Sequence, residues 1–355
     1  MNPHFPEFSS KLITWYLENK RELPWRNQRN PYFIWLSEII LQQTRVSQGI
    51  PYYLRFVQHF PSVLQLAEAQ EQEVLKLWQG LGYYSRARNL LSSAKMIADM
   101  NGVFPQTYEG LLKLKGVGDY TAAAIASICY NEKVAVVDGN VYRVLSRVFG
   151  IDTPINTGKG KKEFKQLAAL LIDPGQPGIY NQAIMEFGAT HCTPKLPNCE
   201  SCMLQTKCHA FAKNQINDLP VKLKSKPAKN RYFNYFLIEG PSGKIAMEKR
   251  NGKDIWKNLF QLPLVETPEV ITETASNDKF EALKDKLQLQ ELTLVAREKK
   301  VHKLSHQHIH TSWWRATTIH ETSNFFGKED LLTLPVPILI ARFLQSLFYQ
   351  DQQKN

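Results

Sequence analysis

Four of the five cysteines in this 355-residue chain lie within a stretch of seventeen residues, and this spacing strongly constrains the local fold. Cys192, Cys199, Cys202 and Cys208 form the pattern C-x6-C-x2-C-x5-C. In a reducing compartment such a cluster indicates a metal rather than disulfides, either a zinc ion or an iron–sulfur cluster. A zinc ribbon normally uses two C-x2-C pairs, and this loop has one. The spacing therefore favours iron–sulfur and leaves zinc as the alternative.

The pattern of apolar residues changes after the cysteine loop. From about residue 8 to 215 it is helical, which predicts helices over Phe8–Leu17, Phe33–Val46, Val74–Leu77, Ala87–Ile97 and Phe164–Leu171. A basic, Pro-punctuated stretch at 218–231 is typical of a linker. Beyond it we expect a small α+β domain, 232–348, with strands at Tyr232–Glu239, Lys244–Lys249, Leu292–Ala296 and Trp313–Ile319 and helices at Lys279–Leu287 and Ile338–Phe348.

The basic balance of the chain indicates an acidic partner. The formal net charge is +11 and the isoelectric point about 9.3, which suits nucleic acid but also fits a merely basic soluble protein. Lys195, Lys207 and Lys213 surround the cysteine loop, where they suit phosphate contact. The first six residues lack a signal-peptide pattern, and prolines interrupt the apolar stretch Leu331–Leu344. We expect a cytosolic protein that does not enter a membrane.

The segment Leu112–Ile125 is typical of two helices joined by a tight glycine turn. Gly116 and Gly118 allow close approach of the backbone, and the free N–H groups at the start of the second helix can bind a phosphate oxygen. This pattern favours sequence-independent DNA binding through a helix–hairpin–helix. The alternative is an ordinary packing corner between two helices.

Two carboxylates are candidates for chemistry. Glu38 is the one acidic residue among large apolar side chains in Phe33–Leu41, so burial should raise its pKa and keep it protonated near neutral pH, as a general acid requires. Asp138 ends the apolar run Val134–Val137 at the start of a helix, where N–H groups stabilise the anion. A solvated helix face for Glu38 and a plain N-cap for Asp138 are the alternatives. Glycoside cleavage requires an acid paired with an ionised carboxylate.

Taken together, these motifs resemble the helix–hairpin–helix DNA glycosylases with an iron–sulfur loop, and within them the MutY-type adenine DNA glycosylases. The resemblance covers nearly the whole chain. It is carried by Ser37–Thr44, the hairpin Lys115–Thr121, Val137–Asn140, Leu23–Arg26 and the four cysteines. It implies a mainly helical catalytic domain over 1–217, with a six-helix barrel and an iron–sulfur module, and a Nudix-like domain over 232–348 that recognises 8-oxoguanine.

The resemblance also implies roles for individual residues. Glu38 would protonate adenine at N7, Asp138 would stabilise the oxocarbenium ion, and the four cysteines would hold a [4Fe-4S] cluster. The substrate would be double-stranded DNA with adenine opposite 8-oxoguanine or guanine, bound by a monomer. Further residues are expected to position the catalytic groups (Asn140 and Tyr120) or to contact the base and the DNA (Arg26, Gln43, Thr44, Leu81, Tyr83, Gly116, Gly118, Ser305 and His306).

The sequence departs from the wider family at informative positions. Tyr120 stands where lyase branches have a nucleophilic Lys, and Tyr142 stands where some adenine glycosylases have a Lys, so we expect a monofunctional glycosylase. Leu304 replaces a Phe before Ser305, and no Nudix box follows Pro263. A bifunctional glycosylase/lyase of the endonuclease III type and a non-catalytic DNA-binding protein with structural zinc are the alternatives. His306, His308 and His310 would share one face of a strand, where a metal site is conceivable.

Overall fold

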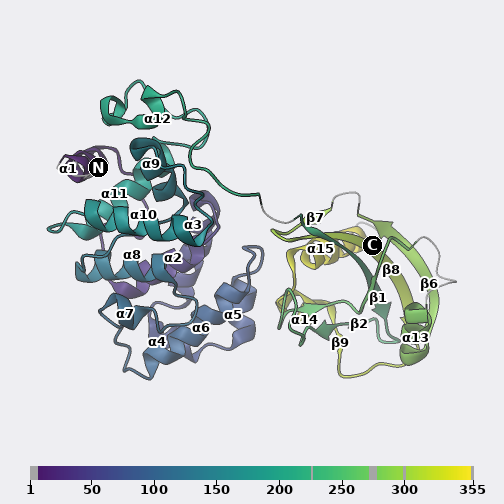
Figure 1. Ribbon diagram of the computed structural model, residues 1–355. Helices are drawn as coiled ribbons and strands as arrows, with labels where there is room; N and C mark the ends of the chain where they lie inside the picture. The colour runs from purple at the N-terminus through teal and green to yellow at the C-terminus, as the bar shows by residue number, and fades with distance from the viewer. Residues whose placement is uncertain (1–6, 225–226, 272–277, 299–300, 353–355) are drawn as a thin grey trace. The chain divides into compact units, whose positions relative to one another are not determined.

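The computed structural model describes residues 7–224, 227–271, 278–298 and 301–352. Met1–Pro6, on which the signal-peptide expectation rests, and Ser225–Lys226 of the expected linker lie outside these ranges. The chain divides into two compact units, one of residues 1–68 and 89–224 and one of residues 69–88 and 225–355. Figure 1 shows helices along the first two hundred residues and a sheet in the C-terminal part. No helix in the described ranges is long and apolar enough to cross a membrane.

The helical part of the chain follows the expected periodicity. Its helices are α1 (Phe8–Asn19), α2 (Pro31–Leu41), α3 (Val46–His59), α4 (Val63–Glu68), α5 (Glu71–Leu77), α6 (Ser85–Ala98), α7 (Tyr108–Leu111), α8 (Asp119–Tyr130), α9 (Gly139–Phe149), α10 (Gly158–Leu171), α11 (Pro177–Thr190) and α12 (His209–Ala212). The predicted helix Phe33–Val46 is wrong at its end, because α2 stops at Leu41 and a turn precedes α3. The short 3₁₀ helix η1 (Gln205–Lys207) lies inside the cysteine loop.

Helix α11 holds the helical unit together by packing against α1, α8 and α9. Small residues allow this close approach: a Cβ on Gly188 would lie 2.7 Å from the Cβ of Asn140 at the start of α9. A Cβ on Gly178 would likewise lie 2.6 Å from the carbonyl oxygen of Ser127 in α8. Contacts this short leave no room for a side chain, so α11 fixes the two helices whose N-termini carry Asp119 and Asp138.

The hairpin differs from the prediction in its first helix. Helix α7 lies before residue 112, with Thr107 as its N-cap, and residues 112–118 form turns that lead to α8. Gly116 has φ +75° and a Cβ there would lie 2.8 Å from Cβ of Asn89, so only glycine fits. Gly118 is the N-cap of α8 and has open space around it. The glycine turn and the second helix of the expected motif are therefore present, preceded by a shorter helix than expected.

The first half of the expected linker is anchored to the helical unit. The buried Arg147 donates to the carbonyl oxygen of Leu219 at 3.1 Å, and Asn156 bonds both backbone groups of Leu223 at 3.0 Å. Val221 accepts from the Ile155 N–H at 3.0 Å. These contacts attach residues 219–223 to the turn between α9 and α10.

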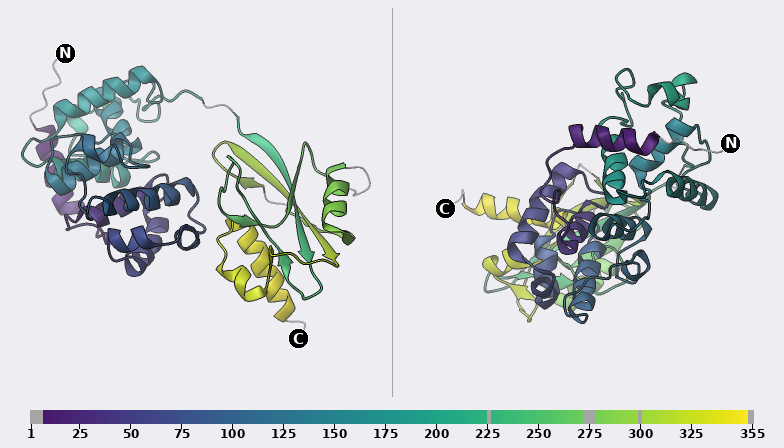
Figure 2. Two further views of the ribbon diagram at one scale, coloured as in Figure 1. Left: turned by 90° about the horizontal axis from the view of Figure 1, so that it is seen from below. Right: turned by 90° about the vertical axis from the view of Figure 1, so that its left-hand side faces the viewer.

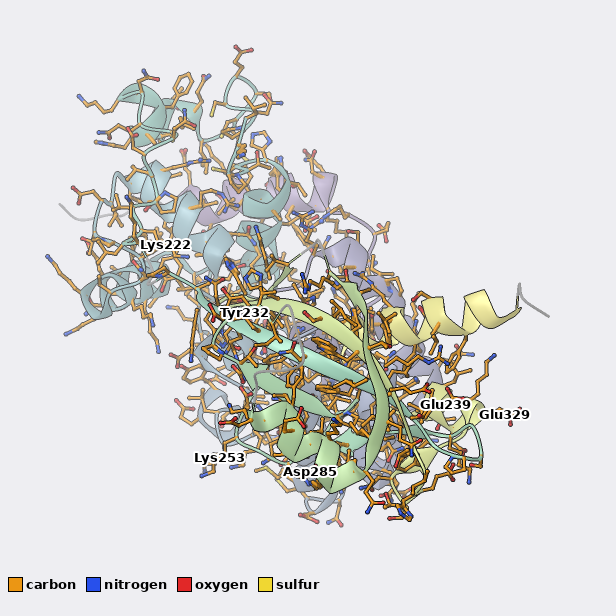
Figure 3. All side chains as sticks on the ribbon, turned by 90° about the vertical axis from the view of Figure 1, so that its right-hand side faces the viewer. Lys222, Tyr232, Glu239, Lys253, Asp285 and Glu329 are labelled. Carbon is orange, nitrogen blue, oxygen red and sulfur yellow. The ribbon has the colours of Figure 1, made fainter. Side chains whose placement is uncertain are left out.

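The second unit contains a sheet with the order β6-β8-β1-β2-β9, joined by β5 beside β1 and β7 beside β8. The strands of the unit are β1 (Lys229–Glu239), β2 (Ile245–Ala246), β3 (Glu248–Lys249), β4 (Phe260–Gln261), β5 (Leu264–Thr267), β6 (Leu289–Arg297), β7 (His302–Lys303), β8 (Gln307–Thr318) and β9 (Phe325–Phe326). Of these, β3 and β4 pair with each other in a separate sheet. The two long strands β1 and β8 are parallel, with Tyr235 opposite Trp313. Figure 3 labels Tyr232 and Glu239 toward the two ends of β1.

Helices cover both faces of this sheet, as Figure 2 shows for α13 (Asp278–Leu287) and α15 (Ile338–Gln352). Adjacent tryptophans on β8 mark the two faces. Trp314 packs edge-on against Phe280 of α13, with ring centroids 5.2 Å apart, whereas Trp313 stacks on Phe343 of α15 at 3.9 Å. Successive residues of a strand point to opposite faces, so each tryptophan fills one core. A third helix, α14 (Lys328–Thr333), precedes α15.

Candidate active site

Glu38 lies in the last turns of α2, the most apolar helix of the unit, and the helix holds its carboxyl at a cavity wall. Its neighbours Ser37 and Ile39 are buried, while Glu38 itself is half-buried. Burial removes the Glu38 carboxyl from water and raises its pKa to about 7. The Tyr120 hydroxyl lowers this pKa through a hydrogen bond, whereas the nearby Asp138 raises it. The expectation of a raised pKa is confirmed, and its main cause is burial.

Asp138 caps α9 as expected. Its Oδ1 accepts from the N–H groups of Asn140 and Val141 at 2.9 and 2.8 Å, and its Oδ2 accepts from the Asn140 side chain at 2.8 Å. These bonds lower the pKa of Asp138, but burial outweighs them, and the net pKa lies above its ordinary value. The expected hydrogen bonds to the anion are present, but the surrounding packing also desolvates the carboxyl and raises its pKa.

One cavity of about 490 Å³ brings these groups together. Its walls come from the end of α2, the hairpin turn and the start of α9, and include Glu38, Gln43, Gly118, Tyr120 and Asp138. The Tyr120 hydroxyl bonds the Glu38 carboxyl and lies 3.2 Å from the sulfur of Met185. Side chains that are a hundred residues apart in the sequence therefore face the same space.

The turn after α2 is tied to the hairpin. The Gln42 side-chain amide donates to Thr121 Oγ1 at 3.1 Å and to the Gly116 carbonyl oxygen at 3.4 Å. The next residue, Gln43, is exposed with φ +54° and lines the same cavity as Gly118. Thr44 is half-buried and its hydroxyl bonds the Gln42 carbonyl oxygen at 3.4 Å, outside the cavity walls.

Arg26 belongs to an ion cluster that the sequence did not reveal. Glu186 on α11 is 2% exposed and accepts from Arg26 at 2.5 Å and from Nε and Nη2 of Arg21 at 2.6 and 2.7 Å. Burial opposes the charge of Glu186, but the two arginines hold its pKa at about 2. Neither Arg26 nor Glu186 is among the residues that line the cavity containing Glu38.

Arg143 connects the cap of α9 with the cysteine loop. It donates to Asn140 Oδ1 at 2.9 Å, to the Gly188 carbonyl oxygen at 2.6 Å and to the Cys192 carbonyl oxygen at 2.7 Å. Because Asn140 in turn donates to Asp138, the guanidinium orients the amide that holds the carboxylate. This partner of Asn140 was missed in the sequence, where Arg143 is one of several basic residues.

The four cysteines of the loop lie close enough to interact electrostatically. Burial raises the pKa of Cys202 to about 11, the Leu204 N–H opposes this, and Cys192, Cys208 and Cys199 raise it further. Each thiol makes it harder for the others to lose a proton, because the resulting thiolates would repel one another. A bound cationic group would neutralise the four thiolates and so remove this repulsion. Within the described ranges no three His, Cys, Asp or Glu side chains are placed to hold a metal ion. Four thiols in one short loop could supply the ligands of either four-thiolate group, an iron–sulfur cluster or a zinc ion.

Tyr83 and Ser305 line one pocket of about 420 Å³ inside the second unit, together with Leu304 and His306. The hydroxyls of Tyr83 and Ser305 share a hydrogen bond. Tyr83 is 44% exposed and has φ +49°, whereas Leu81 is 5% exposed. The Leu81 side chain is packed in the interior of this structure, and its contact with DNA stays a prediction.

The histidines of β8 do not form the conceivable metal site in the described residues. His310 bonds Asn230 at 3.1 Å and stacks on Tyr232 with ring centroids 4.7 Å apart. His306 instead lies in the pocket with Ser305.

These features define a DNA base-excision domain followed by a Nudix-like domain. Residues 36–170 match the HhH-GPD superfamily of base excision DNA repair proteins, and residues 234–346 match the NUDIX domain. Among solved structures, a thermostable thymine-DNA glycosylase is 30% identical with a TM-score of 0.54, covering 59% of this chain and 96% of that one. A complex of endonuclease III with DNA, at 22% identity and a TM-score of 0.51 over 58% and 94% of the chains, shows the shared fold.

Curated relatives narrow this class. An adenine DNA glycosylase of Buchnera aphidicola subsp. Schizaphis graminum is 34% identical over 305 residues, 85% of each chain. Those of Arabidopsis thaliana and Mus musculus are 39% and 46% identical, covering 72% and 60% of this chain. The chain spans less than half of these two relatives, 46% and 43%. The chain belongs to the adenine DNA glycosylase family.

Proposed function

We propose that this protein removes adenine from DNA where adenine lies opposite 8-oxoguanine or guanine, by hydrolysing the N-glycosidic bond. One observation carries the proposal: Glu38 and Asp138 line the same cavity as the phosphate-binding turn at Gly118. An acid with a pKa near 7 beside a hydrogen-bonded carboxylate is the pair that glycoside cleavage needs.

The two carboxyls have different roles in this proposal. Glu38 donates its proton to N7 of adenine, so the electrons of the breaking C1′–N9 bond pass to a neutral leaving base. Asp138 remains anionic and stabilises the oxocarbenium sugar until water adds at C1′ and loses a proton. Asn140 holds Asp138 through its amide, and Tyr120 holds Glu38 through its hydroxyl.

The adenine must leave the base stack to reach this cavity, at a cost of roughly a few kcal/mol. Backbone N–H groups at the start of α8 bind a phosphate beside the target nucleotide. Gln43 and Tyr83, both exposed with positive φ, insert into the stack as the base leaves. Arg26, fixed by Glu186, contacts the extruded adenine.

The opposite base is read by the second unit. Ser305 and His306 supply hydrogen-bonding groups in a pocket that also contains Tyr83, and 8-oxoguanine is the base we assign to it. We infer that the unit recognises nucleotides without hydrolysing them, since no Nudix box follows Pro263.

We further infer that Cys192, Cys199, Cys202 and Cys208 hold a [4Fe-4S] cluster. The cluster would stabilise the loop between α11 and α12 as a structural element, because no cysteine lines the cavity that contains Glu38. Hydrogen bonds from Arg143 connect that loop to Asn140.

A panel of duplexes tests the proposal. We expect release of adenine from duplexes with A opposite 8-oxoguanine and A opposite guanine, and no release from A opposite T. Excision of thymine glycol with strand cleavage would instead support the endonuclease III type of activity. Binding of all duplexes without release of any base would contradict the proposed glycosylase activity and would indicate a non-catalytic DNA-binding protein.

A further inference from the structure

A surface network joins α10 to the helix that binds phosphate. Tyr108 donates its hydroxyl proton to Asp119 Oδ1 at 2.6 Å, and the Lys165 ammonium donates to the Tyr108 hydroxyl at 3.2 Å. The Lys165 ammonium also lies 3.7 Å from Asp119 and 5.4 Å from the centre of the Tyr108 ring. Asp119 is the first residue of α8, immediately after the N-cap Gly118.

A second cavity of about 110 Å³ lies beside this network. Lys161 and Lys165 line it from α10, while Asp119 and Tyr120 separate it from the cavity that contains Glu38. Residues four apart lie on one face of a helix, so the two lysines present their charges together. Both are exposed, whereas Phe164 between them faces the core.

The position of Asp119 is unusual for a site that binds an anion. A carboxylate at the start of a helix stabilises the helix, but it repels a phosphate that approaches the same N–H groups. The ammonium of Lys165 offsets that charge in the free protein. When DNA binds, a phosphate attracts the exposed Lys165 more strongly than does the Asp119 carboxylate, which is 75% exposed.

We propose that Lys161 and Lys165 bind phosphates of the DNA strand next to the phosphate held by the turn at Gly118. Asp119 competes with DNA for Lys165 and so weakens binding. This assignment rests on the proposed function, because it requires a DNA substrate. It extends the DNA-binding surface from the hairpin to α10, a helix in which neither lysine contributes to the cavity that contains Glu38.

The test measures the salt dependence of duplex binding by the full-length protein, in a Glu38→Gln background so that no base is released. The Lys161→Gln/Lys165→Gln double variant should lower the slope of log Kd against log salt by roughly one per lysine. Affinity at 0.1 M salt should fall by on the order of tenfold per lysine. The loss should be equal for A opposite 8-oxoguanine and for matched DNA, because phosphate contacts carry no sequence information.

The matched control is Lys159→Gln/Lys162→Gln, which removes the same charge from the same helix at positions that do not line the cavity. This control should keep the original slope. An unchanged slope in the Lys161/Lys165 variant, or equal losses in both pairs, overturns the assignment. If the protein with both lysines binds no duplex at all, it is the proposed function that fails.

Two further variants distinguish the loss of a DNA contact from a folding defect. Lys161→Gln alone removes no part of the Tyr108 network and should lower the slope by roughly one. Asp119→Asn should tighten binding severalfold, which misfolding cannot produce. Unchanged or weaker binding by Asp119→Asn would contradict competition for Lys165.

Discussion

Replacing Glu186 by Gln should destabilise the helical unit strongly. Glu186 is 2% exposed and Arg26 9%, while Arg21 is 39% exposed. A pKa held at about 2 instead of 4.5 corresponds to about 3 kcal/mol, at about 1.4 kcal/mol per pH unit and with a discount for the partly exposed Arg21. Removal of one partner from a buried ion pair costs a similar 3–5 kcal/mol. At roughly 2–4 °C per kcal/mol for a unit of this size, the melting temperature should fall by about 6–12 °C.

Thermal melting and urea unfolding of the full-length protein at pH 7 would check this magnitude. The Glu186 pKa is lower in the folded protein, so its stabilisation is present above pH 4.5 and is lost as the pH falls toward 2. The difference in melting temperature between the unmodified protein and Glu186→Gln should therefore become smaller below pH 4.5. Glu163→Gln is the matched control, because Glu163 Oε2 is buried without a hydrogen-bond partner among the described residues. A loss below 2 °C for Glu186→Gln, or the same loss in both variants, would refute the reasoning.

Four other predictions test the proposed roles of individual residues. The rate of the chemical step should fall about tenfold per pH unit above 7, where Glu38 deprotonates, and single-turnover rates across pH would show it. Asp138→Asn should retain duplex binding and lose base release, measured by gel shift and by base release; equal losses of both would point to misfolding. Cys199→Ser should lower the iron content and the absorbance near roughly 400 nm, and unchanged absorbance would exclude Cys199 as a ligand. Ser305→Ala should reduce the preference for 8-oxoguanine over guanine opposite adenine without changing the rate on the guanine duplex.

Glu38 was predictable because its signal is local. A single carboxylate in an apolar helical stretch faces solvent, has a raised pKa or is paired with a cation, and the structure confirms the raised pKa of Glu38. Glu186 carries the same signal, between Met185 and Phe187, and could have been singled out on that ground. Its outcome is opposite, because two arginines 160 and 165 residues away stabilise its charge. Local pattern identifies a buried carboxylate, but its protonation depends on distant partners.

The net pKa of Asp138 shows the same limit. Its hydrogen bonds come from the next three residues and follow from the sequence, whereas its desolvation comes from packing around the cavity. The presence of the helices was likewise predictable, but the residues at which they end were not. The turn after Leu41, for example, interrupts an apolar run that continues to Val46. The pocket shared by Tyr83 and Ser305 joins residues 222 apart, which no local pattern indicates.

In the proposed reaction, Glu38 supplies the proton that releases adenine. Single-turnover incubation of the Glu38→Gln variant with DNA carrying A opposite 8-oxoguanine measures this contribution. We expect this variant to bind the duplex as tightly as the unmodified protein and to release no adenine. Release of adenine at an undiminished rate would show that another group is the acid.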